Sequence, residues 1–250
     1  YCSSHSGMGG QANTNSTAGS SNFDGSIQTT VKANPEAGFS IVSYTANGSN
    51  STCGHSLNAA PEVVIIKGRN ADVENWKVYH KGYGTNGSLH LNLTTQDSSS
   101  TAFNQTAPTS SVFSIGIHNA TNQNTKNYIA YCFTPVAGYS AIGSYEGNGS
   151  SDGPFVYLGF KPALVILKLV EGVASSWKIY DNKRDTDNPI EKQLYPNSNN
   201  AEPSDDTRCD FLSNGFKVRT AGSEDNYNNN TVIYYAVAEN PFQANGGLAR

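Results

Sequence analysis

Apolar residues alternate with polar ones in short runs along this chain, a pattern typical of β-strands. Ile27, Thr29 and Val31 form one such run. Similar runs recur at 39–44, 88–93, 111–117, 127–133, 216–219 and 231–238. Pro, Gly and Asn interrupt every helical period, and the one short helix that the pattern permits lies within 185–194. The pattern predicts an all-β fold with about seven strands in each unit of roughly 100 residues, as in β-sandwiches.

The middle of the chain occurs twice. Matched positions lie 101 residues apart: Asn47 and Asn148, Pro61 and Pro162, Lys67 and Lys168, Trp76 and Trp177, and Tyr79 and Tyr180. A period of this length exceeds the roughly 20–50 residues of solenoid repeats, so we expect each unit to fold around its own core. The sequence predicts a flexible arm or linker at 1–22, rich in Gly, Ser and Asn, followed by repeats at 23–134 and 135–250.

Two local signals recur in both repeats. An Asn-Gly-Ser turn occurs at Asn47 and at Asn148, and Asn-Gly is the strongest short-range signal for a hairpin. The continuous apolar runs at 61–67 and 162–168 then predict central strands covered on both faces. We therefore expect two tandem β-sandwich domains, either jelly-roll or immunoglobulin-like.

The composition limits where such a protein works and what it binds. The chain of 250 residues is 36% hydrophobic but only 14% charged, and its net charge is -4. A surface of neutral amides and hydroxyls is common in secreted and particle-borne β-proteins, so we expect an extracellular or virion location. Nucleic-acid binding would require a clustered basic face. A membrane-spanning helix would require about 18 consecutive apolar residues. The sequence has neither, so we expect no nucleic-acid partner and no membrane association.

No motif for catalysis, a cofactor or a metal stands out. The five histidines lack metal-ligand spacing and have no counterparts in the other repeat, and nothing fixes two carboxylates as a glycosidase pair. The candidates for such a pair are Glu146, Asp152, Glu171, Asp205 and Asp206. We therefore expect a non-enzymatic protein with no catalytic, cofactor-binding or metal-binding residues.

The cysteines are the remaining candidates for covalent chemistry. They are Cys2, Cys53, Cys132 and Cys209, at points of the repeats that do not correspond. The composition resembles that of secreted proteins, in which disulfide bonds form, but it does not decide whether these cysteines are bonded. Four cysteines allow three pairings.

Aromatic residues suggest a binding role. The chain has 14 Tyr and 10 Phe, more than we expect the Trp-poor cores to require. Exposed Tyr beside Asn and Asp suits sugar stacking or a polar protein interface. This predicts a carbohydrate- or receptor-binding module as an alternative function, with a cell-surface glycan as partner.

Several phrases resemble a domain of unknown function found in predicted tail and virion proteins of bacteriophages of aquatic bacteria and cyanobacteria. These phrases are TAPTSSVFSIG at 106–116, YIAYCFTPVAGYSAIGSYEGNGSSDGPFVYLGFKPA at 128–163, DFLSNGFKVRT at 210–220 and AENPF at 238–242. The resemblance covers about Asn22 to Phe242 and transfers no catalytic residue. It implies a structural or host-binding role outside the cell.

The first hypothesis is a subunit of an extracellular filament or phage tail fibre that forms homo-oligomers or homopolymers. Assembly would use packing of the sandwiches and an exchanged strand, Ser26, Ile27, Gln28, Thr29, Thr30 and Val31, paired with the edge of a neighbouring subunit. In the alternative, that strand pairs within its own domain.

Overall fold

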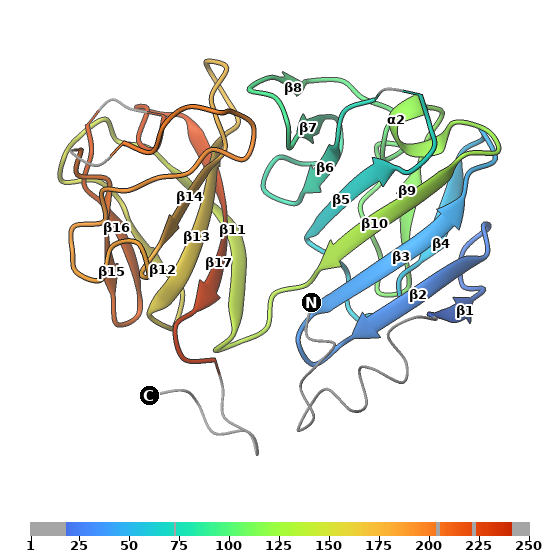
Figure 1. Ribbon diagram of the computed structural model, residues 1–250, viewed down its shortest axis with the longest axis horizontal. Helices are drawn as coiled ribbons and strands as arrows, with labels where there is room; N and C mark the ends of the chain where they lie inside the picture. Colours follow the sequence, from blue (N-terminus) through green and yellow to red (C-terminus); the bar gives the residue numbers. More distant parts are fainter. Residues whose placement is uncertain (1–18, 73, 204–205, 222–223, 242–250) are drawn as a thin grey trace. The chain divides into compact units, whose positions relative to one another are not determined.

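The fold is all β, as predicted. The computed structural model describes residues 19–72, 74–203, 206–221 and 224–241, and it is 41% strand and 2% helical (Figure 1). The chain divides into two compact units, Tyr1–Lys77 with Ser99–Thr134 and Val78–Ser98 with Pro135–Arg250. The segment Val78–Ser98, expected in the first repeat, groups with the second unit.

The first unit is built on an antiparallel sheet. Its strand order is β1 (Ser20–Asn22), β2 (Thr29–Asn34), β3 (Phe39–Thr45), β10 (Asn127–Phe133) and β5 (Val63–Gly68), side by side in Figure 1. A second pair, β4 (Ser51–Gly54) with β9 (Val112–Ile115), contributes Phe113, whose ring packs edge-on against Tyr44 of β3. One helical turn, α2 (Asn119–Asn122), precedes β10.

The larger sheet of the second unit runs β11 (Ser140–Glu146), β17 (Thr231–Ala238), β13 (Pro162–Leu169) and β14 (Lys178–Asp181). The second unit repeats the order β3, β10 and β5 of the first unit as β11, β17 and β13, without counterparts of β1 and β2 among its described strands. A smaller sheet runs β12 (Phe155–Tyr157), β16 (Gly215–Val218) and β15 (Cys209–Leu212). Val165, Tyr180, Phe216 and Val232 belong to the buried core of this unit. The segment after β6 (Lys77–His80) adds the paired strands β7 (Ser88–His90) and β8 (Gln96–Asp97).

The duplication extends to individual hydrogen bonds. Tyr44 Oη donates to the Thr121 carbonyl at 2.7 Å, and Tyr145 Oη donates to the Asp225 carbonyl at the same distance. The two tyrosines are 101 residues apart, whereas their acceptors are 104 residues apart. The second repeat therefore has three more residues than the first between the tyrosine and its acceptor. The same local geometry has therefore been kept in both copies.

The predicted hairpins at Asn47 and Asn148 are wrong. Gly48 and Gly149 do adopt positive φ angles of 73° and 65°, as an Asn-Gly turn requires. The strands that the turns connect do not pair with each other, however, because β3 pairs with β2 and β10 while β4 pairs with β9. Each turn instead carries the chain from one sheet to the other.

Buried asparagines explain this redirection. Asn122 Oδ1 accepts from the Asn47 amide at 3.1 Å, and Asn226 Oδ1 accepts from the Asn148 amide at 2.8 Å. Asn226 Nδ2 also donates to the Ser150 carbonyl at 2.7 Å. These side chains hold each turn against the segment before the last strand of its repeat, so the turn does not close a local hairpin.

The short helix expected within 185–194 does not form. Asp185 Oδ2 accepts from the amides of Glu191 and Lys192, at 2.9 and 2.7 Å. Ile190 forms a bridge with Cys209. The carboxylate thus competes with helical hydrogen bonding and holds the segment as an extended loop.

Candidate functional sites

The predicted assembly strand lies inside the first unit. Ile27, Thr29 and Val31 are buried, whereas Ser26, Gln28 and Thr30 are exposed, which is the alternation that the sequence predicted. The Ser26 amide donates to Thr52 Oγ1, and the Thr52 amide donates to Ser26 Oγ, each at 2.9 Å.

The strand β2 is also paired on both sides. Thr30 lies opposite Ser43 of β3 and opposite Ser21 of β1. The described strand therefore pairs within its own unit, and exchange between subunits would require breaking two ladders.

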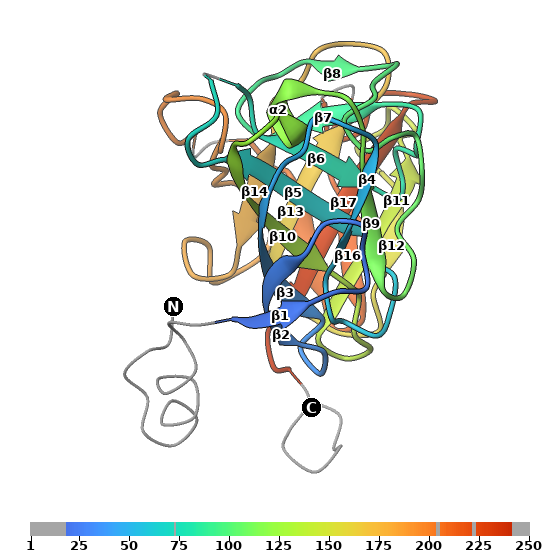
Figure 2. The ribbon, with the colours of Figure 1, turned by 90° about the vertical axis from the view of Figure 1, so that its right-hand side faces the viewer.

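The outermost strand of this sheet is β1, which lies beside β2 in both ribbon views (Figures 1 and 2). In the described part of the chain, no strand pairs with its outer side. Its sequence, Ser20, Ser21 and Asn22, contains neither charge nor proline. The predicted arm at 1–22 thus ends in a strand, while residues 1–18 lie outside the described residues.

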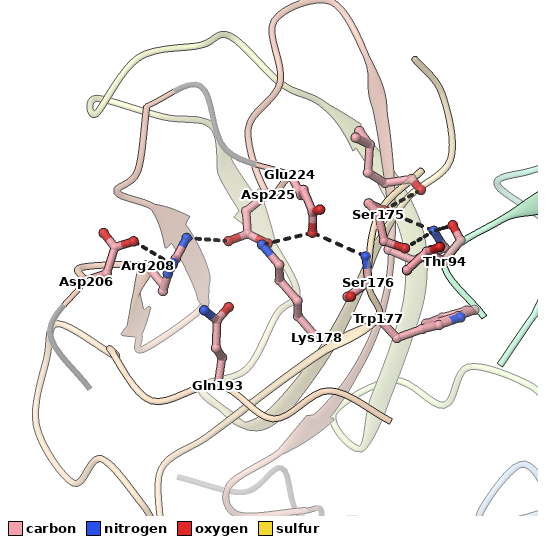
Figure 3. A network of polar contacts seen from close by, with 12 residues as sticks. Thr94, Ser175, Ser176, Trp177, Lys178, Gln193, Asp206, Arg208, Glu224 and Asp225 are labelled. Atoms are coloured by element: carbon pink, nitrogen blue, oxygen red, sulfur yellow. Dashed lines mark hydrogen bonds and ion pairs between the residues drawn. The ribbon is translucent and has the colours of Figure 1, made fainter. Parts of the chain in front are cut away.

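A chain of ion pairs lies in the second unit (Figure 3). Lys178 Nζ is 3.0 Å from Asp225 Oδ1 and 3.6 Å from Glu224 Oε2. Arg208 Nη1 is 3.8 Å from Asp225 Oδ2, and Arg208 also pairs with Asp206. The side chains of Lys178 and Asp225 are only 6% and 3% exposed, so both charges have been removed from water. Buried charged side chains are stable in a fold only when they are paired with an opposite charge.

The strand β14 positions two residues of this network. Lys178 and Tyr180 lie on its buried face. Tyr180 Oη is 2.8 Å from Asp225 Oδ2 and 3.0 Å from Gln193 Oε1. Burial, and the nearby Asp225 charge after it, raise the pKa of Tyr180 well above its usual value. Tyr180 therefore stays protonated and able to donate a hydrogen bond.

The first repeat has the lysine of this network but not its carboxylates. Lys77 corresponds to Lys178 and is also buried, but the positions of Glu224 and Asp225 are occupied by Ala120 and Thr121. The network is therefore a property of the second repeat and not of the shared scaffold. Sequence reasoning missed it, although the mismatch of Thr121 with Asp225 was a visible signal.

A second buried lysine follows the duplicated pattern. Lys168 Nζ donates to the carbonyls of Thr94 and Ser175, at 3.0 and 2.7 Å, and to Ser175 Oγ. Its counterpart Lys67 donates to the Glu74 carbonyl, which matches Ser175 in the alignment. Burial lowers the pKa of Lys168 to about 8, although the charge of Glu224 opposes this shift.

Exposed aromatic rings gather on one edge strand of the second unit. On β12, Phe155 and Tyr157 are 45% and 68% exposed, while Val156 between them is buried. Tyr157 lies opposite Gly215 and Phe155 opposite Lys217, which pairs with Asp152 at 2.7 Å. This outer face combines two aromatic surfaces with polar neighbours.

The described cysteines do not form disulfides. Cys53, Cys132 and Cys209 are buried free thiols, and Cys2 lies outside the described residues. Burial raises the pKa of each thiol, to about 12 for Cys132. The disulfide that the composition left open is absent among these three.

The other titratable candidates include two buried histidines and two carboxylates in ion pairs. Burial lowers the pKa of His80 to about 4 and also lowers the pKa of His55. Of the carboxylates considered for a glycosidase pair, Asp152 and Asp206 pair with Lys217 and Arg208, and Asp205 lies outside the described residues. Among the described residues no group of His, Cys, Asp and Glu is arranged to hold a metal ion, and no helix is long and apolar enough to cross a bilayer.

Fold and sites together define an all-β protein that carries one strand order twice and a buried charged network in the second copy. The model of a family described as a domain of unknown function (DUF7483) matches residues 12–241. The chain therefore belongs to that family. No curated protein and no solved structure matches it. The family description does not mention bacteriophage tails or virions, so that attribution remains a proposal.

Proposed function

We propose that the protein is a non-enzymatic structural subunit of an extracellular filament or phage tail fibre, which assembles through its β-sheet edge. The observation that carries this proposal is the edge strand β1. Proteins usually block such edges with charged residues, proline, a covering segment or a very short edge strand, and β1 is itself short, at three residues. Ser20, Ser21 and Asn22 provide no charge and no proline.

The position of β2 changes how assembly would occur. Because β2 is held between β1 and β3, removing Ser26–Val31 from its own unit would expose Ile27, Thr29 and Val31. Adding a strand to β1 breaks no pairing between the described strands. We therefore place the self-assembly contact at β1, with main-chain hydrogen bonds supplying the affinity, and keep strand exchange as the second route.

Electron microscopy of the purified chain tests this proposal. We expect filaments or higher oligomers from the intact chain and from a control that lacks residues 1–18, which retains β1. A chain that lacks residues 1–21 should stay monomeric. It retains Asn22, whose Oδ1 accepts from the Asp24 amide at 2.9 Å and so supports the start of the unit. Monomers from the intact chain would overturn the proposal.

The second candidate function is binding of a cell-surface glycan or receptor, favoured by the outer face of β12. Two exposed aromatic rings two residues apart on one strand lie roughly 7 Å apart along it, and such rings offer flat apolar surfaces beside polar groups. The nearby charges of Lys217 and Asp152 are paired with each other, which suits a neutral saccharide more than a charged one.

Affinity electrophoresis through gels that contain neutral polysaccharides tests the second candidate. Retardation of the intact chain that is lost in Phe155→Ala and Tyr157→Ala would support it. Equal mobility of all three proteins in every gel would contradict it. Because both rings are exposed, we expect each substitution to change the free energy of unfolding by less than about 0.5 kcal/mol.

A further inference from the structure

The ion pair between Lys178 and Asp225 brings an amine and a carboxyl group together in a site shielded from water. Nζ and Oδ1 are 3.0 Å apart, and the two side chains are 6% and 3% exposed. We propose that these residues condense to an intramolecular amide bond between Lys178 Nζ and Asp225 Cγ, with release of water. This inference is independent of the proposed function.

Glu224 is a second carboxylate that forms an ion pair with Lys178, and we assign it the proton transfer that the reaction requires, for which it must approach to hydrogen-bond distance. Its Oε2 is 3.6 Å from Lys178 Nζ, and the side chain is 37% exposed. Glu224 takes one proton from the ammonium group, and the neutral amine attacks Asp225 Cγ to form the C–N bond. The C–Oδ1 bond then breaks, and the leaving oxygen takes two protons, one through Glu224 and one from the nitrogen. An ammonium and a carboxylate become an amide and one water, so no oxidant or other reactant is needed.

The other oxygen of Asp225 faces one hydrogen-bond donor and one cationic group. Tyr180 Oη lies 2.8 Å from Oδ2, and Arg208 Nη1 lies 3.8 Å from it. When the amine attacks, negative charge develops on the carboxyl oxygens, and the Tyr180 hydroxyl and the positive charge of Arg208, both already at that position, stabilise the intermediate.

Burial favours the condensed product over the ion pair. Two charges removed from water are costly even when paired, whereas a buried amide carries no charge. Fixed groups in contact also react as if at effective concentrations of about 10⁵–10⁸ M. The bond would connect β14 to the segment that leads into β17, two strands that β13 separates in the sheet.

The first repeat provides an internal comparison. Lys77 matches Lys178, but Thr121 matches Asp225 and has no carboxyl group to react. Only the second repeat is therefore expected to carry the bond.

The intact mass of the folded, reduced chain tests the proposal. We expect a mass lower than the sequence mass by one water, and a tryptic digest that contains a branched peptide joining Lys178 to Asp225, uncut after Lys178. Asp225→Ala and Lys178→Arg should have their full sequence masses. Glu224→Gln should accumulate the uncondensed chain.

Two results would overturn the proposal. One is the full sequence mass with normal tryptic cleavage after Lys178. The other is a lost water that maps to Asp24-Gly25 or Asp152-Gly153, because Asp-Gly pairs can lose water by forming a succinimide. The wild-type chain supplies both results, so the test does not depend on the variants folding.

Discussion

Asn226 shows how much one buried side chain contributes to this fold. Its Nδ2 donates to the carbonyls of Ser150 and Thr220, at 2.7 and 2.8 Å, and its Oδ1 accepts from the Asn148 amide. Because Asn226→Ala removes three hydrogen bonds, one of them fully buried, and leaves a cavity at a buried position, we expect a loss of roughly 2–4 kcal/mol in the free energy of unfolding, measured by urea denaturation. The exposed Asn86→Ala is the control and should stay within about 0.5 kcal/mol. Equal effects of the two substitutions would refute the role of Asn226.

Lys168 predicts a dependence of stability on pH. Its folded pKa of about 8 is below the ordinary value of 10.5. Between these values the unfolded chain binds more protons than the folded chain, so stability from this group rises with pH. We expect the wild-type stability to rise relative to Lys168→Met by on the order of 2 kcal/mol across this window. Urea denaturation of both proteins at several pH values measures this, and a constant difference would contradict it.

Because the three described thiols are buried, we expect them to react slowly with alkylating reagents. Burial raises the pKa values of Cys53, Cys132 and Cys209, which disfavours the reactive thiolate and also blocks access to it. In a Cys2→Ser chain, we expect no labelling by iodoacetamide in buffer and three labels in denaturant, measured by mass. Rapid labelling of any of the three in the folded chain would contradict this.

At the scale of elements, sequence reasoning succeeded where the signal is local. Alternation predicted β3, β10 and β17, and the apolar run at 162–168 predicted the central strand β13. The predicted hairpins do not form, because each Asn-Gly turn hydrogen-bonds to a buried asparagine more than seventy residues away. The charged network was missed for the same reason, since Lys178, Arg208 and Asp225 come from three separate segments. Such contacts exist only once the sheets pack.

A proline substitution in β2 tests whether this strand is paired on both sides. Thr30 lies between strands on both sides, and a proline there removes an N–H from one ladder. We expect Thr30→Pro to lower the free energy of unfolding by roughly 3 kcal/mol or more. Thr30→Val retains the backbone donor and is the matched control. Chemical denaturation that gave the same stability for both variants would show that β2 is not held in this way.

At the scale of the whole molecule, the second unit includes a segment from the first repeat. The Thr94 carbonyl accepts from Lys168, and the His90 carbonyl accepts from Trp177 Nε1 at 2.7 Å. His80 Nε2 lies 3.2 Å from the Tyr234 carbonyl. These contacts join Val78–Ser98 to the second unit, which local sequence patterns gave no means of predicting.

A fragment of residues 135–250 should therefore be incomplete. We expect a low thermal midpoint that rises when a synthetic peptide of residues 78–98 is added, because a ligand of the folded state stabilises it. A scrambled peptide of the same composition is the control. If the fragment unfolds cooperatively and neither peptide shifts its midpoint, Val78–Ser98 is not needed by the second unit.

The claim that assembly occurs at the β1 edge is central to the proposed function, and sedimentation velocity over a range of concentrations tests it most directly. The intact chain and the chain lacking residues 1–18 should both shift to larger species as concentration rises. The chain lacking residues 1–21 should sediment as a monomer throughout. If all three sediment as monomers, or if removing β1 leaves assembly unchanged, the account of this protein as an edge-assembling subunit is contradicted.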